Sequence, residues 1–230
     1  MTSPNDETQL CASCEERPAT REDTHDGKTV RVCEICFNKG FMQQVINDRL
    51  LEIMRLKSSG QYDEILALLA STLEAHRAMD HFNELARHVA AQRAWTLYDA
   101  GRYAESEQAY KEWAALGFRD IWNQQLYALG LADTLEALGR DEEAIPALED
   151  ALGNERPWDL QLAMSVLMTL VGVSAKVGRP VDPKWLKVAE AIAKHFSVEL
   201  PSAPSSEASI LALAQAIEGL PEPLLKNKPK

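Results

Sequence analysis

The chain has 230 residues, of which 46% are apolar and 26% charged, a composition typical of a soluble globular protein. Its formal net charge is −11. This acidic excess argues against nucleic-acid binding, which usually needs a basic surface that displaces counterions. It suits a basic protein partner, although an acidic surface also serves solubility alone.

We expect neither a signal peptide nor a membrane-spanning segment. No charged and apolar leader with a cleavage site opens the chain. The longest uncharged run, residues 160–175, is shorter than the roughly 18–20 residues that a bilayer requires, and it contains Gln161 and Ser165. The sequence therefore predicts a buried helix there and a cytoplasmic protein.

Four cysteines near the start form the pattern C-x2-C-x18-C-x2-C: Cys11, Cys14, Cys33 and Cys36. Two C-x2-C turns present four sulfurs to a tetrahedral ion, and this spacing is typical of zinc sites. Two disulfides are the alternative, but they require an oxidising compartment. Four thiolates leave no open coordination position, so the pattern predicts one structural zinc ion. His25 could replace a ligand, but we expect it to be a turn residue.

The segment between the cysteine pairs predicts a β-hairpin. Polar residues 17–24 lead to a turn at 25–28, and residues 29–32 alternate with strand period. The second cysteine pair then runs into an amphipathic helix. Knuckle, hairpin, knuckle and helix together predict a treble-clef-like module.

The stretch CASCEERPAT at residues 11–20, with GKTVRVCEIC at 27–36 and Lys39-Gly40, resembles the small zinc fingers of bacterial protein-arginine-kinase activators and related stress regulators. The resemblance implies a zinc site and a bacterial origin. It is confined to these residues, and it does not imply kinase activation because nothing downstream resembles those regulators.

Residues 41–220 show apolar residues at helical spacing, and a motif recurs along them. A glycine followed by polar residues stands at Gly60, Gly101, Gly139 and Gly178, at intervals of 41, 38 and 39 residues. Each glycine is placed to end one helix, and the residues after it to start another. A period near 40 with one hairpin per unit predicts an α-solenoid.

Two of these units resemble tetratricopeptide repeats. The matching positions are Gly101, Tyr103, Ser106 and Tyr110 in one unit and Gly139, Ala144, Leu148 and Ala151 in the next. The period exceeds the usual 34 residues. The outer units depart from the pattern, with Ile65 at a small-residue position and Pro180 in the last turn. The predicted fold is mainly α, a solenoid of tetratricopeptide-like hairpins with degenerate ends as caps, behind a small four-cysteine zinc module.

The predicted domains are a zinc module at 1–40, helical repeats at 41–200, a linker and C-terminal helix at 201–220 and a disordered basic tail at 221–230. Asp182 and Pro183 suit a helix start. The predicted helices are 41–58, 62–78, 81–99, 104–115, 121–138, 141–152, 157–177, 183–196 and 206–219.

First helices line the concave face of such a solenoid, and this predicts a partner-binding set. Its members are His88, Trp95, Tyr98, Asp99, Asp133 and Glu136, with Ala91, Leu126 and Leu129 beside them. Aromatic and acidic residues there would favour a peptide with apolar anchors and flanking Lys or Arg. Packing between helices is the alternative for Trp95 and Tyr98, and we expect packing for the aromatic cluster Trp113, Phe118, Trp122 and Tyr127.

Little in the sequence suggests catalysis. No cysteine remains for a nucleophile, and neither G-x-S-x-G nor a glycine-rich phosphate loop occurs. His81, Glu84 and His88 share a helix face that a metal would accept, but solvated helices often carry such sets.

We therefore expect a protein–protein interaction adaptor with a structural zinc ion, and not an enzyme. One alternative is an acidic antagonist, such as an immunity protein that covers a basic toxin. A second is a zinc-finger regulator linked to nucleic acid, which the −3 charge of residues 1–40 opposes.

Overall fold

The computed structural model describes residues 10–25, 27–153, 159–200, 203 and 205–218. This part of the chain is mainly helical, with nine α-helices and one two-stranded sheet, as predicted. The chain divides into two compact units, Met1–Ala100 and Gly101–Lys230. The domain boundaries drawn from the sequence stay predictions, and the tail at 221–230 lies outside the described residues.

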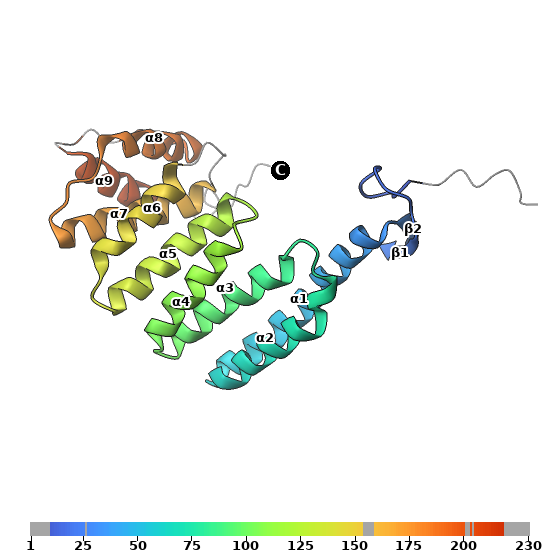
Figure 1. Cartoon of the computed structure of the whole chain (residues 1–230). Helices are drawn as coiled ribbons and strands as arrows, with labels where there is room; N and C mark the ends of the chain where they lie inside the picture. Colours follow the sequence, from blue (N-terminus) through green and yellow to red (C-terminus); the bar gives the residue numbers. More distant parts are fainter. Residues whose placement is uncertain (1–9, 26, 154–158, 201–202, 204, 219–230) are drawn as a thin grey trace, which may run out of the picture. The chain divides into compact units, whose positions relative to one another are not determined.

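Unit 1 is a β-hairpin joined to three helices (Figure 1). The hairpin pairs β1 with β2 in antiparallel register, with Arg21 opposite Val32 and His25 opposite Lys28. α1 packs against α2 and α3. The elements are β1 (Arg21–His25), β2 (Lys28–Val32), α1 (Glu34–Ser58), α2 (Tyr62–His76), the 3₁₀ turn η1 (Arg77–Met79) and α3 (Glu84–Asp99).

α1 begins at Glu34, inside the second cysteine pair, whereas we predicted a helix from residue 41. The reason is that Cys33 is the N-cap: its Sγ accepts a hydrogen bond from the backbone N–H of Cys36 at 3.5 Å. The cysteine knuckle is therefore also the first turn of the helix. Arg21 of β1 fixes this turn, because its guanidinium makes two hydrogen bonds to the Glu34 carboxylate, at 2.8 and 2.9 Å.

The core of unit 1 lies between the three helices. Its buried side chains are Met42, Val45, Ile46, Ile53, Leu56, Ile65, Leu69, Leu85 and Val89. Polar contacts surround this core and connect α1 to the chain near α3. Asn38 Nδ2 lies 3.3 Å from His81 Nε2, and the Lys57 ammonium lies 2.6 Å from the Asp99 carboxylate. These contacts join both ends of α1 to the chain around α3.

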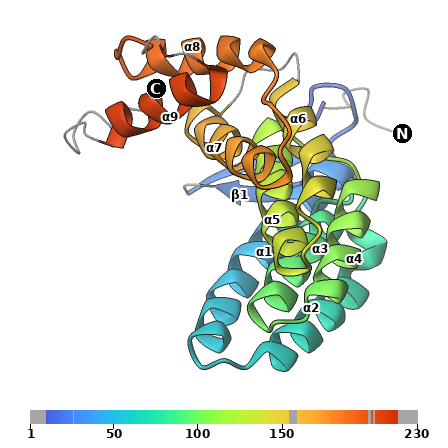
Figure 2. The same cartoon turned by 90° about the vertical axis from the view of Figure 1, so that its left-hand side faces the viewer.

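In unit 2, α5 packs against α4, α6 and α7, and α7 also packs against α8 and α9 (Figure 2). The elements are α4 (Tyr103–Ala115), α5 (Ile121–Ala137), the 3₁₀ turn η2 (Asp141–Ala144), α6 (Ile145–Gly153), α7 (Leu160–Val177), the 3₁₀ turn η3 (Pro183–Trp185), α8 (Leu186–His195) and α9 (Ser206–Glu218). The helices predicted at 141–152 and 183–196 each open with a 3₁₀ turn. The second turn is capped as expected, because Asp182 accepts from the N–H of Lys184.

The predicted aromatic cluster is confirmed for three of its four members. Trp113, Phe118 and Tyr127 meet around Tyr110, with ring centroids 4.9 to 6.3 Å apart. Trp122 is absent from these ring contacts, and 46% of its surface is exposed.

The four glycines predicted to end helices all have left-handed backbones, with φ between 68° and 72°. At two of them the next residue is an arginine that clamps a glutamate three residues on. Arg102 binds Glu105 at 2.7 and 2.6 Å, and Arg140 binds Glu143 at 2.6 and 2.5 Å. The same turn chemistry thus recurs at Gly101 and Gly139.

α7 is the one described helix that is long and apolar enough to span a membrane, judged by length and composition. Core helices of soluble proteins pass the same test. In the structure α7 packs against four other helices, and its Ala163, Leu167 and Leu170 are almost fully buried. Its packing is that of the buried helix expected from the sequence.

Two helical glycines give a matched stability test. A Cβ added at Gly130 would lie 2.7 Å from Tyr110 Cζ and closer still to the hydroxyl, whereas one added at Gly172 would meet nothing within 4 Å. We expect Gly130→Ala to lower the free energy of unfolding by about 1–3 kcal/mol through overpacking. Gly172→Ala should raise it by about 0.5–1 kcal/mol through helix propensity. Urea unfolding measures both, and equal effects would contradict the described packing of Tyr110.

Candidate functional site

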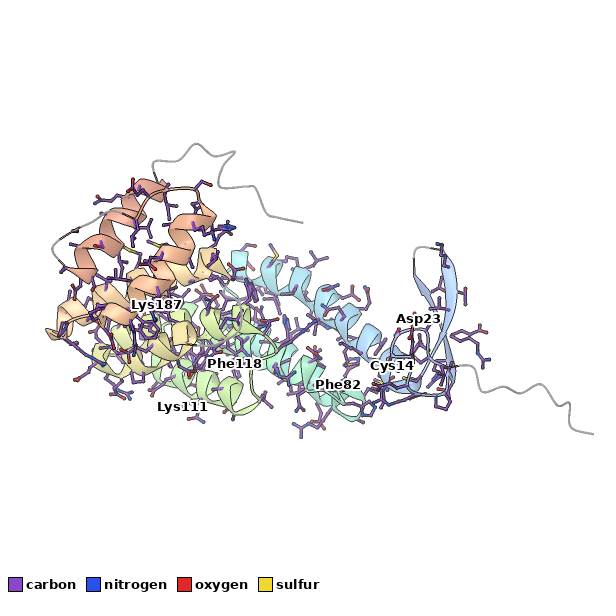
Figure 3. The ribbon with its side chains drawn as sticks, turned by 90° about the horizontal axis from the view of Figure 1, so that it is seen from above. Cys14, Asp23, Phe82, Lys111, Phe118 and Lys187 are labelled. Carbon is purple, nitrogen blue, oxygen red and sulfur yellow. The ribbon has the colours of Figure 1, made fainter. Side chains whose placement is uncertain are left out.

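The cysteine quartet is built from two tight turns that the β-hairpin brings together. In the first turn the Cys11 N–H donates to the Arg17 carbonyl at 2.8 Å, and the Glu15 N–H donates to the Cys11 carbonyl at 2.9 Å. Glu15 has a left-handed φ of 55°. The second turn is the start of α1. Figure 3 shows Cys14 at the foot of the hairpin that carries Asp23.

The four Sγ atoms all lie within 4.8 Å of one another, and Cys14 Sγ lies 4.0 Å from Cys33 Sγ. Four sulfurs bound tetrahedrally at about 2.3 Å from one zinc ion are about 3.8 Å apart, so the quartet needs little movement to close around a metal. Cys11 and Cys33 are buried, and Cys14 and Cys36 are half-buried. These residues fit a metal ion, and the quartet predicted from the sequence is brought together.

Backbone hydrogen bonds lower the pKa of two of the four cysteine thiols, Cys11 and Cys33. Burial of Cys11 opposes ionisation, but hydrogen bonds involving Cys33, Cys14 and Ser13 outweigh it and lower the pKa of its thiol to about 6. The hydrogen bond from the Cys36 backbone also lowers the pKa of Cys33. Burial and the neighbouring sulfurs raise the pKa of Cys36 to about 12. Thiolates so crowded favour a divalent cation among them, because it removes their mutual repulsion.

Arg17 brings positive charge to this cluster. Its Nη1 lies 4.0 Å from Cys14 Sγ, and 44% of its side chain is exposed. Its hydrogen bond to Cys33, with the charges of Cys14 and Cys33, raises the pKa of Arg17. The sequence pattern did not identify this residue, because only the loop geometry turns its side chain back to the sulfurs.

The predicted partner-binding residues divide between the two units. His88, Trp95, Tyr98 and Asp99 lie on α3 in unit 1. Trp95 and Tyr98 are half-buried and engaged in contacts, and Asp99 is ion-paired to Lys57. His88 was predicted to face a bound partner, but its Nε2 is buried. This nitrogen has no hydrogen-bond partner among the described residues. Burial lowers its pKa to about 4.

Asp133 and Glu136 lie on α5 in unit 2, and both are exposed. Glu136 is ion-paired to Lys176 of α7, which also lies 3.3 Å from Asp141. Partial desolvation of the Asp133 carboxylate, and then the charge of Glu136, raise the pKa of Asp133. Trp122 stands on the same face and was missed as a binding residue; its i, i+4, i+7, i+11 spacing to Leu126, Leu129 and Asp133 could have identified it.

The histidine and glutamate set on α3 does not form a metal site. His81 is exposed and contacts Asn38, while the His88 nitrogen is buried. Among the residues that the structure describes, the four cysteines are the group of potential metal ligands that lie close together.

Comparison of the chain with protein-family models, with curated proteins and with solved structures finds no match. The type of zinc finger and the tetratricopeptide character of the hairpins therefore stay predictions from the residues.

We expect one zinc ion per chain, held by the four cysteines. Cys33→Ala should abolish stoichiometric binding, and it should also reduce helicity, because it removes the N-cap of α1 and because metal binding supplies much of the folding energy of such modules. Elemental analysis and far-UV circular dichroism measure the two effects. Ser13→Ala, in the first knuckle, is the control that should change neither, because its hydrogen bond to Cys11 Sγ comes from the backbone N–H. Reduced, folded wild-type protein with almost no zinc would contradict the site.

His88 predicts a pH dependence of stability. Its pKa is about 4 in the folded state, below the ordinary histidine value of 6.5, so the unfolded chain binds the proton more readily. Stability is full above about pH 6.5 and is lost as the pH falls towards 4. Between pH 7 and pH 5 we expect a loss of about 1–2 kcal/mol in urea unfolding. His88→Phe should remove this contribution and leave the part of the slope that comes from the cysteine quartet, whereas the exposed His195→Gln should keep the whole slope. An unchanged slope in His88→Phe would refute the assignment.

Proposed function

We propose that this protein is an interaction scaffold, in which a zinc-stapled module leads into tetratricopeptide-like hairpins that bind a protein or peptide partner. The recurring left-handed glycines and the two Arg–Glu clamps support a repeated hairpin. Stacked hairpins of this kind form a solenoid whose first helices share one face. We do not assign an enzymatic activity, and reduced thiols with zinc suit a cytoplasmic protein.

The observation that carries the proposal is a stripe along one face of α5, the residues Trp122, Leu126, Leu129, Asp133 and Glu136, called here the α5 stripe. Leu126 and Leu129 are half-buried, and 46% of Trp122 is exposed. An exposed tryptophan beside two leucines offers apolar area that water solvates poorly. Such residues are frequent anchors in protein interfaces.

The acidic end of the α5 stripe supplies charge selectivity. Glu136 is neutralised by Lys176, and among the described residues no cation lies within ion-pair distance of Asp133. Partial desolvation of the carboxylate, which raises the pKa of Asp133, also strengthens its attraction for a partner cation, because water screens the charge less. A Lys or Arg of the partner fits this position.

The geometry of a helix sets the spacing of the two anchor points. Trp122 and Asp133 are eleven residues apart on α5, which at 1.5 Å per residue is about 16 Å. An extended peptide that lies along the helix covers this distance in about five residues. The preferred ligand therefore carries an apolar side chain and a basic side chain about five positions apart.

Selection from a random peptide library displayed on phage tests this function. We expect enrichment of peptides with that apolar and basic pair, and a loss of at least tenfold in affinity, by fluorescence anisotropy, in Trp122→Ala and Asp133→Asn. Glu190→Gln, which removes one exposed charge from α8, is the matched control. Because Trp122 is half-exposed, urea unfolding should change little.

Selected peptides that lack the pair, or that bind both variants like the wild type, would contradict the α5 stripe as the binding surface. An affinity that rests almost wholly on charge and falls steeply with salt would instead favour the acidic antagonist.

A further inference from the structure

The first cysteine turn places one arginine against the sulfurs. The Arg17 carbonyl accepts from the Cys11 N–H at 2.8 Å, which fixes the backbone of Arg17 on the turn that presents Cys11. The guanidinium then extends to Cys14 Sγ, at 4.0 Å. This contact places the positive charge of Arg17 beside one sulfur of the cysteine quartet.

The other two arginines of the described module have different tasks. Arg21 is held in a two-bond ion pair with Glu34 and lies over the Phe37 ring at 5.4 Å. The Arg31 guanidinium reaches the Ala19 carbonyl at 3.5 Å. Arg17 is therefore the arginine whose charge these contacts direct to the cysteine quartet.

A zinc ion with four thiolates carries a net charge of −2, and this charge is costly to hold on a partly buried surface. A cation next to a sulfur offsets the charge and withdraws electron density through N–H···S contacts. Residues outside the ligand set commonly change metal affinity by 10- to 100-fold through such effects.

We propose that Arg17 is a positioning residue of the metal centre, whose guanidinium offsets the charge of the zinc tetrathiolate and slows the loss of the ion. This inference rests on the zinc site of the proposed function. Arg17 touches a ligand sulfur and takes no ligand position, so its removal leaves the four-cysteine coordination intact.

The test measures zinc affinity by competition with a chelator of known affinity, and the rate of zinc transfer to 4-(2-pyridylazo)resorcinol. For Arg17→Gln we expect roughly tenfold weaker binding and roughly tenfold faster transfer. Arg17→Lys keeps the charge and should recover most of the difference. Arg31→Gln, which removes the same charge from the neighbouring strand, should behave like the wild type.

Two further readouts separate charge from structure. The Co²⁺-substituted protein should keep the same absorption bands in Arg17→Gln, because the tetrahedral sulfur geometry is unchanged. Raising NaCl from 0.05 to 0.5 M should narrow the affinity gap, because half of the Arg17 side chain is in solvent and its field is screened.

Equal affinity and transfer rate in wild type and Arg17→Gln would overturn the role of Arg17 while leaving the zinc site standing. So would equal losses in Arg17→Gln and Arg31→Gln, or altered Co²⁺ bands. If Arg17→Gln does not fold, Arg17→Lys decides: wild-type affinity at low salt supports the charge role, and a loss refutes it. A wild-type chain that binds no zinc would overturn the site itself.

Discussion

The described turns after α1, α3, α5 and α7 each depend on one residue that leaves the helix with a positive φ, a conformation that costs an ordinary L-residue about 1–2 kcal/mol. Glycine has no Cβ and adopts it freely, as at Gly101 and Gly139, where φ is 72° and 69°. The arginine that follows each glycine then binds a glutamate in the first turn of the next helix. The reversal thus ends one helix and starts its partner within a few residues.

The cysteine module and the helical part of unit 1 share the helix α1. α1 starts at the second cysteine knuckle and continues into the core at Met42 and Val45. Between them Asn38 contacts His81, and Phe41 packs against His76 with ring centroids 5.8 Å apart. α1 therefore connects the cysteine quartet to the end of α2 and to the residues just before α3.

Several acidic side chains of unit 2 are held in ion pairs within the protein. Glu107 is buried, and its carboxylate lies 2.7 Å from the Lys111 ammonium and 2.6 Å from the Arg140 guanidinium, which lower its pKa. Glu136 and Asp141 share Lys176 in the same way. These ion pairs tie successive helices of unit 2 together. These pairs leave the net charge of −11 unchanged, but the net charge does not specify where a basic partner would bind. Exposed Asp133, which makes no ion pair among the described residues, is better placed to select such a partner.

The sequence by itself determined the ligand set of the candidate metal centre, the glycine positions of the chain reversals and most helix ends, because spacing, capping and backbone preference act within a few residues. It also identified Asp133 and Glu136 as one acidic helix face, which follows from helical periodicity. Only the tertiary structure decided that α1 begins at the cysteine knuckle, that the His88 nitrogen is buried and that Trp122 stays exposed while Trp113 and Tyr127 pack. It also turned Arg17 back onto the sulfurs. The start of α1 combines a local cap at Cys33 with the ion pair between Arg21 and Glu34, which are 13 residues apart. The other features depend on contacts between residues distant along the chain, or on a loop's path through space, and amino-acid type alone encodes neither.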